Sequence, residues 1–192
     1  MSDREPRLGL RERKKHRTRE NIRRAAHRLI AEHGYAATTV DDIAAMADVS
    51  TSTFFRYFPN KAAVLVSDHL VDAVLEHYPE APAELSPVGA YRWGFEQVIA
   101  EMGGAGLSEE VTRQALMYTL PEAAGPLYTQ YVVAMEKVAQ AVAVRLNLPV
   151  DQTGVYGGAI LGVTMQFMNG RPTDADRLVN GLNRLDDLLR QA

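Results

Sequence analysis

The sequence contains no cysteine, has a single tryptophan among its 192 residues, and lacks any long apolar run. Without cysteine the chain forms neither disulfides nor a thiolate site, which is compatible with a reducing compartment. No apolar stretch approaches the roughly 18 to 20 residues that cross a bilayer, so we predict no membrane helix. The charged N-terminal segment also lacks the apolar core of a secretion signal. We therefore expect a protein of the cytoplasm.

The short motifs that mark common enzyme classes are missing as well. The chain has no nucleophile elbow, no glycine-rich phosphate loop followed by Lys-Ser or Lys-Thr, and no HExxH. We accordingly predict no catalytic residues, no cofactor and no enzymatic activity. Three potential metal ligands can share one helix face: His69, Asp72 and Glu76. They could hold a metal, but a solvated charged face explains this spacing better.

Charge is distributed unevenly along the chain, although the net formal charge is only −3. Residues 1–61 hold 13 Lys and Arg against 8 Asp and Glu, whereas residues 62–192 hold 8 against 16. A basic segment joined to an acidic body suggests that the basic segment meets a polyanion. A solvated charged helix would give the same pattern, so charge alone does not decide between the two.

Apolar residues recur at helical spacing through most of the chain, and no segment alternates as a strand would. The pattern predicts an all-α fold of about nine helices. The first helix follows a flexible basic arm at 1–10 and ends at Gly34, and a glycine-rich loop is expected at 103–106. The later helices are expected after Thr39, after Ser50, and at about 61–78, 87–102, 108–118, 123–146, 150–169 and 174–190.

Two short predicted helices, separated by a tight turn, follow the first helix in the sequence. Thr39 and Ser50 are both suited to N-capping, and Asp48-Val49 lies between the two helices as the turn. A helix, a tight turn and a second helix, preceded by a third, form the plan of a helix-turn-helix. We therefore predict an N-terminal three-helix DNA-binding domain at residues 11–60.

The helix after Ser50 has the residues that a recognition helix needs. Its first turn is small and hydroxylated, so it can approach the groove floor and bond base edges or phosphates. Phe55 can make only apolar contact, for instance with a thymine methyl, and Tyr57 can donate to a phosphate. Ser50 fits a cap as well as a base reader. The candidate DNA contacts are Thr39, Ser50, Thr51, Ser52, Thr53, Phe55, Arg56, Tyr57 and Lys61.

These residues closely resemble the DNA-binding domain of the tetracycline-repressor (TetR) family. The resemblance covers about residues 15–65 and rests on Gly34-Tyr35, Thr38-Thr39, Ile43-Ala44, Val49-Ser50 and the run TFFRYFPNK. It implies phosphate contacts by Thr39, Tyr57 and Lys61, and groove contacts by Thr51, Ser52, Thr53 and Phe55. The chain departs from the family pattern at Asp48, where glycine is usual, and at Ser52 and Phe55, which replace the frequent Gly and Tyr.

The resemblance also implies how the protein works. It predicts a homodimer on a near-palindromic double-stranded operator, and a ligand-binding and dimerisation domain at 61–192. A small-molecule effector there would release the DNA, so the expected function is that of a repressor. A constitutive or metal-responsive DNA-binding regulator without an organic effector is the alternative.

Two features of the C-terminal part suggest a subunit interface. Gly154, Gly158 and Gly162 recur every four residues, which lets another helix approach closely. The last predicted helix carries a leucine stripe formed by Leu178, Leu182, Leu185 and Leu189. Packing within one subunit would use the same residues. The resemblance favours the subunit interface, because the last two helices form a four-helix bundle between subunits in that family.

The middle helices supply large and adaptable apolar side chains, as ligand sites commonly do. We expect the effector to be a small, largely apolar organic molecule, and residues 90–145 faintly resemble regulators that bind acyl-CoA-like molecules. The candidate pocket residues are Trp93, Phe95, Met102, Met117, Tyr118, Tyr128, Tyr131, Met135 and Phe167.

Overall fold

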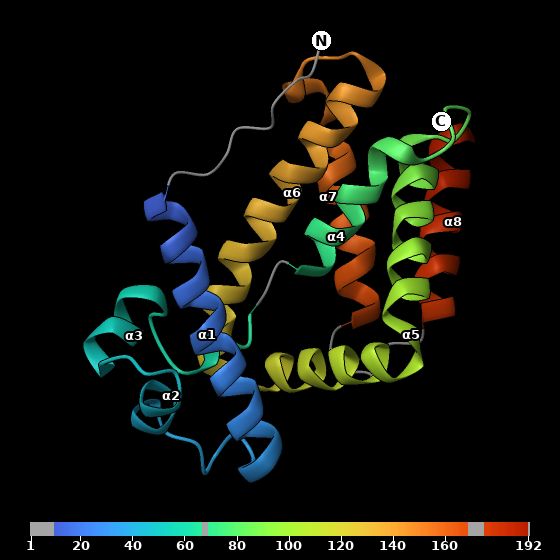
Figure 1. The fold of residues 1–192 in the computed structure, drawn as a ribbon. Coiled ribbons are helices and arrows are strands. Elements are labelled where there is room, and N and C mark those ends of the chain that lie inside the picture. The colour runs from blue at the N-terminus through green and yellow to red at the C-terminus, as the bar shows by residue number, and fades with distance from the viewer. Residues whose placement is uncertain (1–9, 67–68, 169–174, 192) are drawn as a thin grey trace. The chain divides into compact units, whose positions relative to one another are not determined.

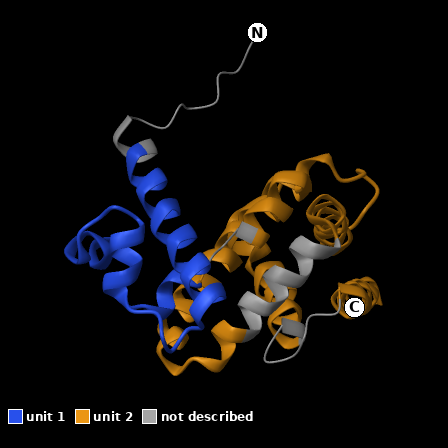
Figure 2. Cartoon of the chain, turned by 60° about the horizontal axis from the view of Figure 1, so that its bottom comes forward, with its two compact units in different colours: residues 1–65 blue, residues 66–192 orange. Residues whose placement is uncertain are grey.

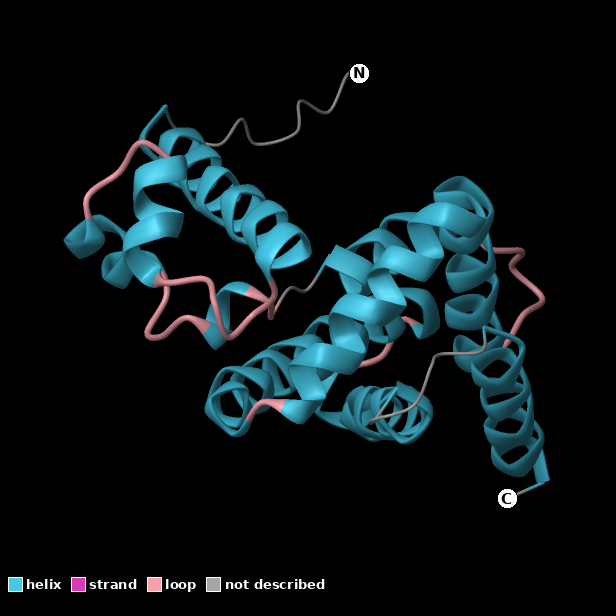
Figure 3. Ribbon diagram, turned by 90° about the horizontal axis from the view of Figure 1, so that it is seen from below, coloured by secondary structure: helices cyan, strands magenta, loops and turns pink. Residues whose placement is uncertain are grey.

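The computed structural model describes residues 10–66, 69–168 and 175–191, without the side chains of 10–13, 69, 104–115 and 167–168. The chain forms two compact units that divide between Leu65 and Val66, as Figure 2 shows. Helices account for all the regular secondary structure in the described ranges (Figure 3). The predicted all-α fold is therefore confirmed. The predicted arm at 1–10 lies almost entirely outside the described residues.

Unit 1 contains three α-helices: α1 (Leu10–His33), α2 (Val40–Met46) and α3 (Thr51–Tyr57). Helix α1 ends as the sequence predicts, because Gly34 adopts a left-handed φ of +82° and its N–H donates to the carbonyl of Ile30 at 2.8 Å. The apolar face of α1 is buried, with Ile22 and Ala26 fully inaccessible to solvent. Helix α1 packs against α2, and α2 packs against α3.

The segment after α3 corrects one prediction. Asn60 caps the following turn as expected, since its Oδ1 accepts from the N–H of Ala63 at 2.8 Å. The turn is only a short 3-10 helix (Ala62–Val64), and the next α-helix begins at His69 instead of continuing from 61. The side chains of this short turn are all buried. A short buried 3-10 turn in unit 1 therefore stands where the first turns of a long helix were predicted.

Unit 2 contains the remaining helices: α4 (His69–His77), α5 (Pro87–Thr119), α6 (Ala124–Leu146), α7 (Val150–Met168) and α8 (Ala175–Gln191). Short 3-10 turns, Tyr78–Glu80 and Pro121–Ala123, come before α5 and α6. Helices α6 and α7 lie side by side, and α5 packs against α4 and α8 (Figure 1). The predicted ranges of α6, α7 and α8 agree with the structure to within one residue at each end.

The loop predicted at 103–106 is also corrected. Helix α5 bends at one residue, Gly103, whose φ of +65° and ψ of 172° lie outside the helical region. Helical backbone resumes immediately after it, so α5 consists of two segments and the described part of the chain has nine α-helical segments. A residue with a Cβ is strained at this φ, which explains why the bend falls on a glycine.

Two glycines allow helices of unit 2 to cross closely. A Cβ built on Gly94 of α5 would lie 2.7 Å from the carbonyl oxygen of Val74 in α4. A Cβ on Gly157 of α7 would overlap the carbonyl of Met135 in α6. Backbone atoms cannot move aside as a flexible side chain can, so both positions require glycine.

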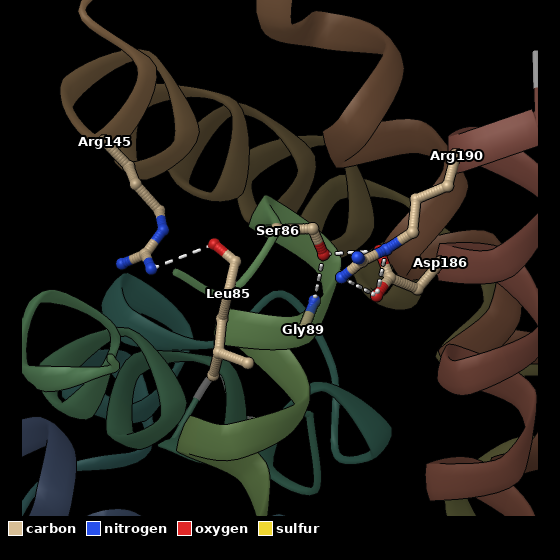
Figure 4. Close-up of polar contacts among 6 residues, drawn as sticks. All are labelled: Leu85, Ser86, Gly89, Arg145, Asp186 and Arg190. Atoms are coloured by element: carbon tan, nitrogen blue, oxygen red, sulfur yellow. Dashed lines mark hydrogen bonds and ion pairs between the residues drawn. The ribbon is translucent and has the colours of Figure 1, made fainter. Parts of the chain in front are cut away.

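Polar side chains connect the ends of the unit 2 helices, as Figure 4 shows. Ser86 caps α5 by accepting from the N–H of Gly89 at 2.9 Å, and its hydroxyl donates to Asp186 of α8. Arg190 also donates to Asp186, at 3.0 Å. Arg145 of α6 donates to the carbonyl of Leu85 at 3.1 Å. These bonds fix the start of α5 between α6 and α8.

Candidate nucleic-acid interface and ligand cavity

The start of α2 is held by reciprocal hydrogen bonds between Thr39 and Asp42. Thr39 Oγ1 accepts from the N–H of Asp42 at 3.1 Å, and Asp42 Oδ2 accepts from the N–H of Thr39 at 3.0 Å. Oδ2 also accepts from the Thr39 hydroxyl at 2.6 Å, and these bonds lower the pKa of Asp42 below its usual value. Asp42 therefore stays ionised and keeps the Thr39 hydroxyl engaged. A phosphate contact through Thr39 would have to share this hydroxyl.

Asp48 makes the turn between α2 and α3 in place of the glycine that the family pattern usually has. Its φ is +54°, in the left-handed region that aspartate tolerates better than most residues. The N–H of Asp48 donates to Ala45 at 3.2 Å, and the N–H of Val49 donates to Ala44 at 3.0 Å. The turn between α2 and α3 therefore forms with aspartate at position 48 instead of glycine.

A network of hydroxyl groups surrounds the start of α3. Ser50 is the N-cap, since its Oγ accepts from the N–H of Thr53 at 3.1 Å. The same Oγ lies 2.9 Å from the hydroxyls of Ser52 and Thr53, and Thr51 donates to Asp41 of α2 at 2.8 Å. These contacts orient the first turn of α3, and Ser52 remains exposed.

Helix α3 has one buried and one exposed face. Phe54 and Phe58 are 0% and 1% exposed, and the guanidinium of Arg19 on α1 lies 5.2 Å from the Phe58 ring centroid. Phe55 is 52% exposed and touches Phe54 edge to face, with 5.5 Å between ring centroids. Arg56 is exposed beside the ring of Tyr57. The buried phenylalanines fix the helix while its other face stays open to a partner.

Lys61 has internal partners that the sequence did not reveal. Its Nζ donates to the carbonyls of Tyr35 at 2.8 Å and Thr38 at 2.9 Å, both in the segment between α1 and α2. The ammonium also lies 4.0 Å from the centroid of the Tyr35 ring. Lys61 therefore fixes this connection whether or not it also meets a phosphate.

Unit 2 contains a cavity of about 40 Å³ to which all five of its helices contribute. Four predicted pocket residues line it: Phe95, Met117, Tyr118 and Tyr131. The other lining residues were not predicted, because helix crossings rather than periodicity decide which side chains converge there. Those additional lining residues are Leu70, Val71, Tyr91, Leu127, Gln130, Ala134, Leu161, Thr164 and Leu178.

The other predicted pocket residues lie elsewhere or outside the described side chains. Trp93, Met102 and Met135 are partly buried and pack against the core of unit 2 without lining the cavity. Tyr128 is 72% exposed, so its assignment to the pocket is corrected. The side chain of Phe167 is not among those described.

Tyrosine hydroxyls supply much of the polarity of the cavity wall. The hydroxyls of Tyr118 and Tyr131 hydrogen-bond to each other, and Tyr91 and Thr164 also line the cavity. Burial raises the pKa of Tyr91, Tyr118 and Tyr131 above the usual value of 10. The three phenols are therefore neutral at physiological pH. The cavity can offer hydroxyl groups to a ligand in a mostly apolar surrounding.

The predicted subunit-interface residues fall into two groups. Leu178 and Leu182 are 1% and 0% exposed and belong to the core of unit 2, so their assignment to the subunit interface is corrected. Leu185 packs partly on the same core, while Leu189 is 40% exposed. Gly158 and Gly162 of α7 are exposed, and a Cβ on either would meet no atom within 4 Å.

Among the described residues, no group of three or more His, Asp or Glu side chains is placed to hold a metal ion. The same ranges include no helix with the length and apolar character needed to cross a membrane.

Comparison with known proteins gives consistent results. Residues 22–67 match the model of bacterial regulatory proteins of the tetR family. The transcriptional regulator TcmR of Streptomyces glaucescens is 31% identical over 150 residues, covering 74% of this chain and 66% of TcmR. The transcriptional repressor Rv3405c of Mycobacterium tuberculosis is 33% identical over 135 residues, covering 66% of this chain and 69% of the repressor. The alignments thus span about two thirds of each relative.

Solved structures show the same architecture. FadR of Thermus thermophilus, a TetR-family repressor in complex with lauroyl-CoA, aligns with a TM-score of 0.58 and 25% identity, over 87% of this chain and 92% of FadR. The TetR-family repressor AlkX of Dietzia aligns with a TM-score of 0.61 and 17% identity, over 91% of this chain and 96% of AlkX. The likeness to AlkX concerns the fold alone.

Proposed function

The chain belongs to the TetR family of bacterial transcriptional regulators, and on that premise we propose that it is a repressor released from its operator by a small, largely apolar effector. It binds a near-palindromic operator as a homodimer, with α3 of each subunit in the major groove. The observation that carries this proposal is the division of α3 into a buried face and an exposed face. Phe54 and Phe58 hold the helix, and Ser52, Phe55 and Arg56 are open to DNA.

The contacts fall into two kinds. Ser52 and Phe55 reach base edges, because they are exposed on the first turns of a helix that must lie near the groove floor. Tyr57, Lys61 and Thr39 contact phosphates, with Lys61 using the ammonium proton that its two carbonyl partners leave over. If each subunit neutralises three or four phosphates, the logarithm of affinity falls against the logarithm of salt with a slope of roughly −5 to −7.

An exposed face of α7 supports the homodimer. Gly158 and Gly162 lie there with Val155, which is 66% exposed, and Met165, which is 40% exposed. Small and apolar residues on one helix face allow close packing against a second copy of the helix. Dimerisation sets the spacing of the two recognition helices, about 34 to 36 Å for half-sites one DNA turn apart.

The cavity of unit 2 supports control by an effector. Leu70 and Val71 of α4 form part of its wall, and α4 is the first helix of unit 2 after the chain leaves the DNA-binding unit. An effector in the cavity therefore acts on the helix that follows the DNA-binding unit directly. The effector must bind the DNA-incompetent state better, and a hundredfold preference corresponds to about 2.7 kcal/mol.

The test is binding of the purified protein to labelled DNA from upstream of its own gene, across a salt series. Cell extract is added in one arm, and lauroyl-CoA in another because the FadR neighbour was solved with it. Specific binding that extract or lauroyl-CoA weakens supports the proposal. Tight binding that neither changes supports the constitutive alternative, and no specific binding at any salt contradicts DNA recognition itself.

A further inference from the structure

We propose that the cavity of unit 2 takes a neutral ligand whose carbonyl or hydroxyl oxygen replaces the hydrogen bond between Tyr118 and Tyr131. This inference rests on the proposed effector function and names the chemical class of the effector. It depends on the two tyrosines, the residues around them and the size of the cavity.

The Tyr118–Tyr131 pair joins two helices at the cavity wall. Tyr118 lies in the last turn of α5, and Tyr131 lies on α6, thirteen residues later. A phenol has one proton to donate, so one hydroxyl of the pair donates and the other accepts. The accepting tyrosine keeps its own proton for another acceptor. The pair can therefore donate to a ligand oxygen, and a ligand that separates the two hydroxyls can receive both protons.

The other hydroxyls of the cavity wall are less available to a ligand. Tyr91 is only 2% exposed. Thr164 Oγ1 donates to the carbonyl of Ile160 at 3.0 Å, so its proton is already engaged within its own helix. Tyr118 and Tyr131 are held to each other by a single bond between side chains, so a ligand exchanges more readily with them.

The cavity favours a neutral ligand over an anion. Apolar side chains make up most of its wall, and none of the lining residues that the structure describes is charged. Burial raises the pKa of both Tyr118 and Tyr131, so the hydroxyls act as neutral donors. A carboxylate would lose its hydration without gaining a cation there, which costs far more than burying a carbonyl that two hydroxyls can satisfy.

The cavity must widen to take a ligand of this class. Its volume of about 40 Å³ is far below the roughly 300 to 1,000 Å³ of ligand pockets. The single side-chain bond between Tyr118 and Tyr131 is a place where the wall can open. Separating the last turn of α5 from α6 breaks the Tyr118–Tyr131 bond, and a ligand oxygen placed between the hydroxyls offsets that loss.

The experiment is calorimetric titration of the full chain with two sets of matched compounds. One set is 2-undecanone, its alkene isostere 2-methyl-1-undecene, and decanoate. The other is 2-acetonaphthone, 2-isopropenylnaphthalene and 2-naphthoate. Within each set only the oxygen chemistry changes, and the two sets differ in shape. We expect at least one ketone to bind about tenfold more tightly than its alkene and its carboxylate, as one to two hydrogen bonds would give.

Three tyrosine-to-phenylalanine variants test which hydroxyl groups bind the ketone oxygen. Tyr118→Phe and Tyr131→Phe should each reduce the ketone preference over the alkene to about threefold or less, with alkene binding retained as evidence of an intact cavity. Tyr128→Phe is the matched control, because Tyr128 lies on α6 outside the cavity wall and is 72% exposed. It should leave the preference unchanged.

Several results would overturn the inference: binding of neither set, equal or tighter binding of a carboxylate, or a ketone preference that survives both cavity variants. Release of the operator is measured separately. If the ketone binds through the tyrosines but leaves DNA binding unchanged, the effector role fails while the cavity chemistry holds. If extract releases DNA but no ketone is preferred, the cavity chemistry fails while the repressor function holds.

Discussion

The ammonium nitrogen of Lys61 lies 2.8 Å from the carbonyl oxygen of Tyr35, and 4.0 Å from the centroid of the same residue's ring. It also lies 2.9 Å from the carbonyl of Thr38. One side chain thus holds the connection between α1 and α2, directly before the Thr39 cap. The lysine that the family resemblance assigns to a phosphate is also a structural residue.

Lys61→Met should destabilise the protein by about 2 kcal/mol, because it removes two charge-assisted hydrogen bonds and a cation–π contact. The control is Lys14→Met, which removes one positive charge from an exposed position on α1 and should cost less than about 0.5 kcal/mol. Urea unfolding of both variants measures the difference. Equal stabilities would mean that the carbonyl contacts contribute nothing. If Lys61 also contacts a phosphate, its loss lowers the salt slope by about 0.9 per subunit.

Phe55→Ala should weaken operator binding about five- to thirtyfold and cost only about 1 kcal/mol of stability, because this ring is half exposed, touches Phe54 edge to face, and is assigned by our proposal to a base contact. Phe54→Ala should instead cost about 3 to 5 kcal/mol of stability, because its ring is fully buried. Fluorescence anisotropy with labelled DNA and urea unfolding separate the two effects. An unchanged affinity for the Phe55 variant would remove this residue from the interface.

Gly157→Ala should destabilise unit 2 by more than about 2 kcal/mol, because the new Cβ overlaps the backbone carbonyl of Met135 on the adjacent helix. Gly125→Ala is the control, since a Cβ there meets nothing within 4 Å and the gain in helix propensity is up to about 1 kcal/mol. Thermal unfolding of both variants gives the comparison. A neutral Gly157 variant would show that α6 and α7 can separate at little cost.

Gly158→Arg should convert the protein to monomers, because a long charged side chain would then stand on the exposed α7 face that we assign to the subunit interface. The matched control is Val144→Arg, at an 84% exposed position on α6. Sedimentation velocity gives the mass of each variant. A dimeric Gly158 variant would place the interface on another surface.

Stability should fall as the pH rises above 10, with Tyr78 as one cause. Burial raises the pKa of Tyr78 to about 12, although the nearby Arg145 guanidinium opposes the shift. Between pH 10 and 12 the folded state keeps this proton while the unfolded state releases it, so the stabilisation present below pH 10 is lost across that range. The slope from one such group is at most about 1.4 kcal/mol per pH unit. Tyr78→Phe should flatten the decline in urea unfolding measured from pH 9 to 12, and an unchanged slope would assign the decline to other groups.

Local rules predicted the DNA-binding unit well, because its features are decided within a few residues. The cap at Thr39, the end of α1 at Gly34 and the turn at Asp48 each depend on hydrogen bonds between near neighbours. The predicted helix from 61 failed for a tertiary reason. The segment after Asn60 is buried, and Lys61 is bound to carbonyls more than twenty residues away in sequence.

The cavity could be predicted only in part, since periodicity does not give the rotation of each helix. Tyr128 and Tyr131 are the same residue type three positions apart on α6, yet the first is exposed and the second lines the cavity. Leu178 shows the same limit, because a leucine stripe is equally suited to a subunit interface and to a core. Only the packing of α8 against α5 and α7 places Leu178 inside.

Trp93 of α5 is the only indole in the sequence, and it packs against the core of unit 2. Its emission therefore reports on unit 2 alone, while circular dichroism sums the helices of both units. Recording both signals during one denaturation shows whether the two units melt as one cooperative body or in sequence. The chain thus carries an intrinsic optical reporter that distinguishes unit 2 from unit 1 without any added label.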